Sequence, residues 1–331
     1  ERGAALSLDY ALFNNPRLKP GSRVVLTAAI KGTPRVLMDG IIDHYQFNPA
    51  SGSTGASLTV SGEDLTALMN MVEVSLEYPG MGDWEIALLV LAKYAALGVM
   101  PVVIPPLSSP ISDPLEEIPQ QSDTDRGYLQ ALAAKHSYVF SLQPGPVPLM
   151  SQAYWGPLIK IGLPQKALTV DMGAATNVES INFTYDAQTP TQVYGAVSDA
   201  DTELVVPVLT MTSTNLPPLV MEPALLANQP FVRKSMLRYQ GPDALEGQQL
   251  AQAITNQSTE AAVTASGTLD VLRYGDVLTA PGLVGVRGVG QSYDGYYYVK
   301  SVDHQLSPGE YKQNFTLSRE GLGSLIPEVR P

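Results

Sequence analysis

Glycine and proline interrupt this chain so often that long helices cannot be its main building block. The 331 residues include 28 Gly and 27 Pro. Both residues break helices, whereas both fit the turns that join short strands. Tyr outnumbers Phe by 16 to 6, and aromatic residues of this kind suit the half-buried surface of a sheet. The sequence therefore predicts a mainly β fold with α/β insertions.

The composition limits the class of protein further. A length of 331 residues predicts two or three domains, and a hydrophobic content of 44% is enough for their cores. The net charge of −12 disfavours tight binding to nucleic acid or to an anionic membrane. Since the chain has no Cys, disulfides, thiolate nucleophiles and cysteine metal sites are excluded. The chain starts at Glu1 without Met or a secretion leader, so we expect that a beginning has been removed or is not included.

One apolar stretch, residues 86–104, raises the question of a membrane span. Asp83 and Gly98 are suitable caps for a helix at Trp84–Leu97. Such a helix is about 21 Å long at 1.5 Å per residue, whereas a bilayer core needs about 30 Å. We therefore expect a buried helix followed by a short strand at Val102–Ile104, and no membrane insertion; a transmembrane helix is the alternative.

Local patterns divide the chain into strand-rich and helix-containing parts. Strands rich in Val, Ile, Leu and Thr are expected at Ser22–Ile30, Arg35–Phe47 and Ala56–Gly62. Helices are expected at Leu65–Met71 and Thr124–His136. Further strands are expected later in the chain, at Tyr138–Leu142, Leu158–Ile161 and within Leu168–Tyr185.

These patterns predict five segments. The two end segments read as strands, the middle one mixes helices and strands, and the segment that interrupts the C-terminal strands is rich in Pro and Thr. We expect a first β-barrel at 1–64, an α/β middle domain at 65–162, a second β-barrel formed by 163–186 and 258–323, an insertion at 187–257 with a helix near 244–256, and a C-terminal tail at 324–331.

Internal repetition is the most informative pattern in the chain. The dipeptide Asp-His occurs at Asp43-His44 and at Asp303-His304, each time on an expected strand that begins after an Asp-Gly pair. Two similar segments follow, Leu58–Ser61 with the sequence LTVS and Phe315–Ser318 with the sequence FTLS. We predict two similar small β-barrels, one at each end, with His44 and His304 at corresponding strand positions; chance similarity is the alternative.

A search for chemical motifs finds no constellation that would carry a reaction. The chain has no HExxH motif, no GxSxG motif and no histidine pair at helical spacing. The glycine-rich segment 285–290 lacks the spacing of a phosphate-binding loop and the helix that must follow it. The acid pairs Asp123/Asp125 and Asp199/Asp201 fit a helix start and a loop. We therefore predict no catalytic, cofactor-binding or metal site, and no cofactor.

Three sequences of the glycosylation type occur, at Asn182, Asn256 and Asn314. Two of them fall within expected strands. In the absence of a secretion leader, we attribute them to chance.

Residues 273–327 carry a dense set of motifs. They include Tyr274-Gly275, Arg287-Gly288, Asp294-Gly295, Asp303-His304 and Arg319-Glu320-Gly321. With these motifs the segment closely resembles the C-terminal part of the phage late control D family of tail hub proteins. Gln120–Leu142 resembles the middle-domain helix of that family, and Met38–Ile42 with Leu58–Asp64 resembles its first barrel. Residues 187–256 match no part of it.

The resemblance implies a structural protein of a contractile-tail or injection-system baseplate, related to the hub module of VgrG-type spikes. Such a hub is a homotrimer in which two barrels per chain give six similar units, and it joins a sixfold tail tube to a threefold spike. The implied partners are the tail tube or a tube-initiator protein, a separate spike protein and other baseplate proteins. DNA or protein cargo would pass through the lumen without specific binding, and the net charge of −12 predicts an acidic or neutral lumen.

The resemblance also implies what the motif residues do and where the protein works. They are structural positions rather than a site: Tyr274, Gly275, Arg287, Gly288, Asp294, Gly295, Asp303, His304, Arg319, Glu320 and Gly321. The implied location is a virion tail baseplate or an extracellular injection particle that is assembled in the bacterial cytoplasm. The particle is a phage tail, a tailocin or an effector-delivery machine.

We therefore expect that the protein is not an enzyme. The main alternative is a tail-associated glycoside hydrolase of the cell wall, which would need a convergent pair of carboxylates in a cleft. A carbohydrate-binding module or adhesin would need exposed aromatic residues on one face. Tyr296–Tyr298 lie next to one another on an expected strand and therefore alternate between faces.

Overall fold

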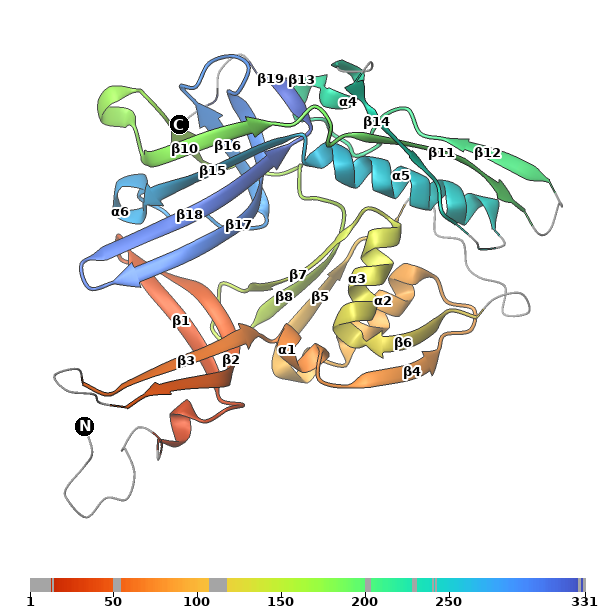
Figure 1. The fold of residues 1–331 in the computed structure, drawn as a ribbon. Helices are drawn as coiled ribbons and strands as arrows, with labels where there is room; N and C mark the ends of the chain where they lie inside the picture. Colours follow the sequence, from red (N-terminus) through yellow and green to blue (C-terminus); the bar gives the residue numbers. More distant parts are fainter. Residues whose placement is uncertain are drawn as a thin grey trace. The chain divides into compact units, whose positions relative to one another are not determined.

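The computed structural model describes most of the chain. The described residues are 13, 15–49, 55–106, 118–199, 204–227, 231–239, 241, 243–326 and 329. They form a mainly β protein that divides into two compact units (Figure 1). The first unit contains the described residues up to Leu132 together with Phe140–Gly156; the second contains Ala133–Val139 and the described residues from Pro157 onward.

The first unit begins with a three-stranded antiparallel sheet. Its strands are β1 (Arg23–Ile30), β2 (Thr33–Asn48) and β3 (Ser57–Asp64), in the order β1-β2-β3, so the three predicted strands are confirmed. Lys31 and Gly32 join β1 to β2 with φ angles of 49° and 83°. Two consecutive positive φ angles are what a two-residue hairpin loop of the favoured twist requires.

The rest of the first unit is α/β. Two small sheets, β4-β6 and β5-β8-β7, accompany helices whose apolar residues form the core, and Trp155 is the largest fully buried side chain. The elements in chain order are α1 (Thr66–Met69), β4 (Glu73–Glu77), α2 (Asp83–Ala92), β5 (Val99–Val103), β6 (Gln120–Thr124), α3 (Asp125–Lys135), β7 (Val139–Pro144) and β8 (Ser151–Gly156). Among the described residues, no helix is long and apolar enough to span a membrane.

Helix α2 is shorter than the predicted helix at Trp84–Leu97. It ends at Ala92, and a separate 3-10 turn covers Ala95–Leu97 before Gly98 adopts a left-handed conformation. The two residues that follow the helix, Lys93 and Tyr94, both contact one carboxylate. The Nζ atom of Lys93 lies 3.1 Å from Asp125 Oδ1, and the Tyr94 hydroxyl donates to Asp125 Oδ2 at 2.8 Å.

The starts of both long helices differ from prediction by one residue. Gly82 rather than Asp83 is the N-cap of α2, and its amide donates to the Glu85 carboxylate at 2.6 Å. Helix α3 begins at Asp125, because Thr124 rather than Asp123 accepts a hydrogen bond from the helix: its Oγ1 receives the Gly127 amide at 3.1 Å.

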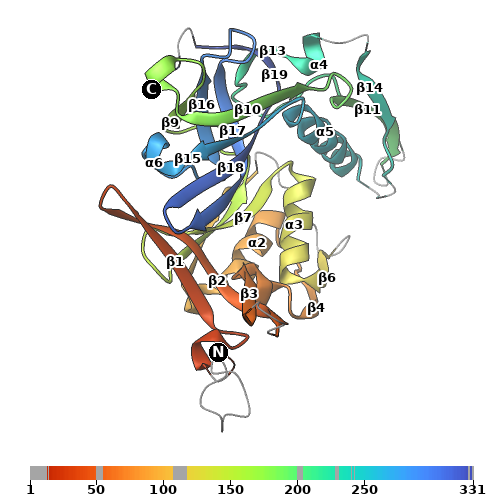
Figure 2. The same cartoon turned by 60° about the vertical axis from the view of Figure 1, so that its left-hand side comes forward.

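The second unit is organised around a six-stranded sheet that curls into a half-barrel (Figure 2). The strand order is β10-β15-β18-β17-β16-β9, and every neighbouring pair is antiparallel except β16 and β9. The short helix α6 (Val271–Tyr274) follows β15. The strands are β9 (Gln165–Thr169), β10 (Val178–Tyr185), β15 (Val263–Asp270), β16 (Gly282–Arg287), β17 (Gly295–Ser307) and β18 (Glu310–Arg319).

The segment between β10 and β15 builds its own small layer pair. Helix α5 packs on one face of the sheet β12-β11-β14, where Val193, Val197 and Val208 meet Ala251 of the helix. The predicted helix near 244–256 is confirmed and continues to Glu260, and Asp243 caps it by accepting the Leu245 amide at 2.6 Å. The elements are β11 (Thr191–Ser198), β12 (Val205–Leu209), β13 (Val220–Pro223), α4 (Ala224–Ala227), β14 (Arg233–Met236) and α5 (Ala244–Glu260).

The strand predicted at Leu158–Ile161 is absent from the structure of these described residues. The side chain of Lys160 is instead buried, with its ammonium group 2.6 Å from Glu260. The backbone amide of Lys160 donates to the Leu158 carbonyl oxygen at 2.9 Å, so the segment forms a local turn instead of pairing with a strand.

The predicted correspondence of His44 and His304 is wrong in register. Both histidines lie in the middle strand of three consecutive antiparallel strands, β1-β2-β3 and β16-β17-β18. However, His44 directly follows the bulge in β2 and faces Ser61, whereas His304 lies beyond the bulge at Val299/Ser301 and faces Gln313. The two Asp-His pairs thus occupy different places in similar meanders, because the sequence match did not include the bulges.

Candidate functional site

One face of the half-barrel sheet is covered by small polar side chains from four strands. Because side chains alternate along a strand and paired residues share a face, the register fixes its members. Three rows cross the strands β10, β15, β18 and β17. They consist of Ser180, Thr268, Asn314 and Asp303; of Asn182, Ser266, Thr316 and Ser301; and of Thr184, Thr264, Ser318 and Tyr298, of which the last two are buried. We call the eleven Ser, Thr, Asn and Asp residues of these rows the polar face.

The opposite side of the same four strands is the core. Between the polar residues stand Phe183, Ala265, Leu317 and Val299 in one row, and Ile181, Gly267, Phe315 and Val302 in the next. Leu317 and Val299 are fully buried. The sequences Asn182-Phe183-Thr184 and Asn314-Phe315-Thr316 are therefore explained by this alternation, in which Asn and Thr point outward and Phe points inward.

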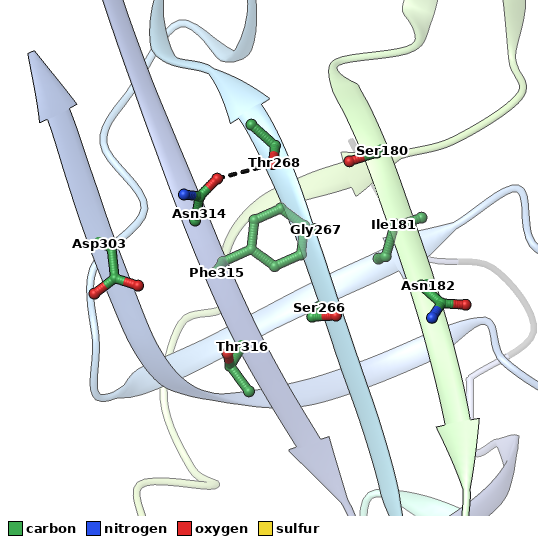
Figure 3. A pocket seen from close by; sticks show the side chains of 10 residues that line it. All are labelled: Ser180, Ile181, Asn182, Ser266, Gly267, Thr268, Asp303, Asn314, Phe315 and Thr316. Carbon is green, nitrogen blue, oxygen red and sulfur yellow. Dashed lines mark hydrogen bonds between the residues drawn. The ribbon is translucent and has the colours of Figure 1, made fainter.

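A shallow groove of about 410 Å³ lies on the polar face (Figure 3). Gly267 lies at its centre, and a side chain at this position would collide with the Ser180 carbonyl oxygen and with the Phe315 ring. The Phe315 ring fills the space under the glycine. At the rim of the groove, Thr268 Oγ1 donates to Asn314 Oδ1 at 2.8 Å (Figure 3). The groove thus offers hydroxyl and carboxamide groups above an aromatic floor.

Charges are sparse on the polar face and mostly negative at its margin. Asp303 is the one charged member of the three rows. In the next row, Lys312 is neutralised by Glu179 at 3.2 Å and by Glu310 at 3.0 Å. Lys300 is exposed at the bulge beside Ser301. The face and its margin therefore combine a neutral centre with more carboxylates than cations.

Asp303 is the one predicted motif residue on the polar face, and the buried Arg319 lies on the other side of the same sheet. Arg319 is fully buried at the end of β18, on the core side. Its guanidinium donates to the carbonyl oxygens of Ser292 and Asp294 at 2.5 and 3.0 Å and lies 4.3 Å from the centre of the Tyr297 ring. Burial lowers the pKa of Arg319 from its ordinary value. A cation placed in this way holds the loop before β17 against the sheet, so its role is structural.

Glu320 belongs to a second buried group of charges. The ammonium of Lys160 lies 2.6 Å from Glu260 Oε1 and 3.4 Å from Glu320 Oε2, and all three side chains are buried. Glu320 also accepts the Leu219 amide, and Glu260 accepts the Asn215 amide group at 3.0 Å. Burial raises the pKa of Glu260, the nearby Lys160 lowers it, and Glu320 raises it again, with a net increase. We call Lys160, Glu260 and Glu320 the buried triad.

The glycines of the motifs permit close approaches of the backbone. Gly288 has a φ of 88°, and a side chain there would collide with the Val170 carbonyl oxygen. Gly321 pairs with Pro223 across the β13–β19 pair, where β19 spans Gly321–Ser324, and a side chain at Gly321 would collide with the Glu222 carbonyl oxygen. Asp294, just before Gly295, closes the loop by accepting the Val289 amide at 2.9 Å. These residues shape turns and do not converge on a ligand.

The remaining motif residues are also held by internal contacts. The Arg287 side chain donates to Thr169 Oγ1 at 2.9 Å, and the Tyr274 hydroxyl donates to the Lys166 carbonyl oxygen. Gly275 ends α6 in a left-handed conformation. Nδ1 of His304 lies 2.7 Å from the Tyr311 hydroxyl. Burial lowers the pKa of His304, although the neighbouring Asp303 opposes this shift. Burial also raises the pKa of Tyr311 to about 12.

A second cavity is lined by two carboxylates, as the active site of a hydrolase would be. It measures about 800 Å³ and lies beside the β13–β19 pair, where Glu222 and Asp294 face it together with Arg287. Asp294 is already engaged in closing its loop. Among the described residues, no three His, Cys, Asp or Glu side chains are grouped so that they could hold a metal ion.

Comparison with known proteins gives no match in sequence but clear matches in structure. No protein-family model matches the chain, and no curated protein does. A tail protein from Neisseria meningitidis MC58 superposes with a TM-score of 0.61 at 17% identity, over 93% of this chain and 86% of the other. The 43 kDa tail protein of prophage MuSo2 from Shewanella oneidensis gives a TM-score of 0.61 at 13% identity, over 92% and 86%.

This chain has the tail-protein fold. A component of the type VI secretion system of E. coli, described as similar in structure to the T4 tail proteins gp27 and gp5, shares it. That component superposes with a TM-score of 0.54 at 12% identity, over 96% of this chain and 70% of the other. The resemblance to tail hub proteins that the sequence motifs indicate is thus supported by the fold. The proteins that share this tail-protein fold are named as tail and secretion components rather than as enzymes.

Sequence reasoning missed both the polar face and the buried triad. The polar face combines strands that are far apart in the chain, and the paired sequences Asn-Phe-Thr at 182–184 and 314–316 were the available signal. The buried triad brings together residues 100 and 160 positions apart. A lone lysine in an expected strand, Lys160, was the only local sign of it.

Proposed function

We propose that this chain is a structural hub of a contractile-tail or injection-system baseplate. The observation that carries the proposal is the tail-protein fold, which extends over more than nine-tenths of the chain in each of the three comparisons. The similar meanders β1-β2-β3 and β16-β17-β18 support two related barrel-type units per chain, at 1–64 and at 163–186 with 258–323. The segment 65–162 is then the α/β middle domain, and 187–257 is an insertion.

In this proposal three chains form a ring. Two similar units in each of three chains give the six positions that a sixfold tail tube needs, and the threefold symmetry suits a spike. A closed ring uses two different surfaces of each chain, and the geometry of closure fixes the number of copies. The sheet β12-β11-β14 supplies a candidate contact surface, because its side away from α5 exposes Tyr194, Val205, Leu209 and Met236.

The proposed partners are the tail tube or a tube-initiator protein, the spike and other baseplate proteins, and DNA or protein cargo passes through the ring. The proposed location is the tail baseplate of a virion or of an extracellular injection particle, assembled in the bacterial cytoplasm. The decisive experiment is to purify the particle that contains this chain and to determine where it lies and how many copies are present. Three copies between tube and spike are expected; six copies, or a position in the sheath, would contradict the hub.

We further propose that the protein is not a cell-wall hydrolase. Zymography of the purified chain on peptidoglycan should leave the gel uncleared. Glu222→Gln and Asp294→Asn provide the matched controls, because these carboxylates line the cavity of about 800 Å³ beside the β13–β19 pair. Clearing by the natural chain that disappears in either variant would establish the hydrolase instead.

A further inference from the structure

The cavity of about 800 Å³ beside the β13–β19 pair is assembled from segments that lie far apart in the chain. Its walls come from β13, from the turn at 288–294, from β19 and from the C-terminal segment, where Ile326 and Val329 line it. Val329 is buried and packs against Gly285, which leaves no room for a side chain there. A volume between about 300 and 1,000 Å³ is typical of ligand pockets, so the size of this cavity suits a binding site.

The rim of the cavity is apolar and adaptable. Met172 and Met221 both line it, and their side chains are 47% and 67% exposed. Leu325, between the lining residues Ser324 and Ile326, is also exposed. Methionine side chains are unbranched and polarizable, and they recur at surfaces that accommodate varied protein segments. Exposed apolar side chains around a hollow therefore indicate a surface that another molecule covers.

Two opposite charges in the cavity remain available for a ligand. The carboxylate of Glu222 is exposed, and the described residues give it neither a hydrogen bond nor an ion pair. Arg287 uses Nε to bind Thr169 Oγ1, so its terminal nitrogens can still donate. Asp294 is the third charge, but it already accepts the Val289 amide. The cavity thus offers one free acceptor and one free donor of opposite charge.

Simple ligands satisfy only part of this lining. A phosphate or a polyanion would suit Arg287 but would be repelled by Glu222 and Asp294. A hydrocarbon chain would cover the methionines but would leave charged groups without partners. A peptide segment supplies all three contacts at once, because it combines backbone carbonyl oxygens, a basic side chain and apolar side chains.

We propose that this cavity binds an extended segment of a partner protein in which one Lys or Arg stands among apolar side chains. The basic side chain pairs with Glu222, a backbone carbonyl oxygen accepts from Arg287, and the apolar side chains are covered by Met172 and Met221. The net charge of −12 also favours the approach of a basic segment over an acidic one. The inference goes beyond the proposed hub function and does not depend on it, because the cavity lies within one unit of a single chain.

The site can be tested with peptides on the purified full chain. A displayed library of random twelve-residue peptides is selected on the chain, and the best binders are synthesised and measured by fluorescence anisotropy. We expect binders of micromolar affinity with one Lys or Arg among apolar residues. Glu222→Gln should weaken them about five- to tenfold, because a charge-assisted hydrogen bond is lost, and Met221→Ser should also weaken them. Glu73→Gln and Met71→Ser, the same changes at exposed positions of the first unit, should leave the affinity unchanged.

A charge swap tests the direct contact. Glu222→Lys should weaken the basic peptide more than Glu222→Gln does. The same peptide with its Lys or Arg replaced by Glu should bind Glu222→Lys better than it binds the natural chain. Such a rescue cannot come from misfolding, because it depends on the residues of both partners. Hydrogen exchange should show protection of β13, β19 and the turn at 288–294 when the peptide is bound.

Three results would overturn the proposal. They are the recovery of no peptide, binders that lack a basic residue, and binders with equal affinity for Glu222→Gln and Glu73→Gln. None of them bears on the hub, whose test is the position and copy number of the chain in the particle. Conversely, a chain that lies away from the tube–spike junction but binds basic peptides at Glu222 would keep the binding site and remove the hub.

Discussion

The sheet β1-β2-β3 and the half-barrel sheet show the same alternation of polar and apolar side chains along their strands. They bury the apolar side chains to different degrees. In β2 and β3, the pairs His44–Ser61, Gln46–Thr59 and Asn48–Ser57 form one polar side, as Thr316 and Ser318 do in β18. The residues between them, such as Leu58 and Val60, are only half-buried, whereas Phe315 and Leu317 are fully buried. The alternation of side chains therefore determines which face of each sheet is polar. The number of neighbouring strands determines how far the apolar side chains of the other face are buried, and hence how much they stabilise the fold.

A matched pair of truncations tests this contrast most directly. Phe315→Ala removes a buried ring that also fills the space under Gly267, and it should lower the free energy of unfolding by about 3–5 kcal/mol. Leu58→Ala, at the matching place in the repeat, should cost only about 1–2 kcal/mol, because its side chain is half exposed. Thermal and urea unfolding measure both. Equal losses would show that the two sheets bury their apolar faces equally.

Each unit contains its own buried or partly buried ion pair, and we expect the next largest difference in stability when these pairs are broken. Lys160→Met leaves Glu260 and Glu320 buried without their cation and should destabilise the second unit by about 3 kcal/mol. This loss is at the low end of the range expected when one partner of a buried ion pair is removed. Glu260 has a raised pKa, so its protonation relieves part of the repulsion between Glu260 and Glu320. Hydrogen exchange would locate the loss around α5 and β18.

The control for that change lies in the first unit. Arg23 holds Asp39 through two contacts of 2.7 Å, but Arg23 remains partly exposed. Arg23→Met should therefore cost less than Lys160→Met, and the loss should appear in β1 and β2. A double variant, Lys160→Met with Glu260→Gln, should recover part of the stability; no recovery would mean that the carboxylate was not the source of the cost.

His304, in the half-barrel sheet, should make the stability of the chain depend on pH. Burial lowers the pKa of His304 in the folded chain below the ordinary value of 6.5. The unfolded chain therefore takes up this proton first, so stability is full above about pH 6.5 and falls as the pH drops below it. His304→Gln should flatten the dependence of the melting temperature between pH 7.5 and 5.5. An unchanged dependence in His304→Gln would contradict the burial argument.

The smallest changes in stability are expected from substitutions on the polar sides of the two sheets. Thr59→Val and Thr316→Val replace a hydroxyl by a methyl group on a solvent-facing strand position. Each should change the free energy of unfolding by less than about 0.5 kcal/mol, because no buried partner is lost. Chemical denaturation measures this directly. A loss above 1 kcal/mol at Thr316 alone would indicate that the polar face contributes to stability.

The strands and the long helices could be predicted from short-range sequence patterns. The pairing of strands that are distant in the sequence could not. The alternation in Phe315–Ser318 and the cap at Asp243 are short-range features, and both are found where the sequence places them. The order β10-β15-β18, by contrast, depends on which strands close over one core, and no local pattern records it. The repeat around His44 and His304 predicted two similar sets of antiparallel strands. The register of these strands depends on β-bulges, whose positions the sequence does not indicate.

The same limit applies to the charged residues. Arg319 and Glu320 are adjacent in the chain, yet one turns to the loop before β17 and the other to Lys160. A charged pair in sequence normally indicates a solvated turn. Here both side chains are buried, because each meets its partners from segments that are distant along the chain. Resemblance to a family identified these positions, while only the structure assigned their contacts.

The pairing of β13 with β19 ties the middle of the segment 187–257 to the motif region. Val220 pairs with Ser324 and Pro223 pairs with Gly321, while Leu219 and Asn215 bond to the buried triad. This segment is consequently not an exchangeable cassette, although its sequence shows none of the motifs that indicate the tail hub family. A chimera that replaced it would have to bring its own partner for Gly321–Ser324 and its own donors for Glu260 and Glu320. Variation in this segment and variation in those residues should therefore be inherited together.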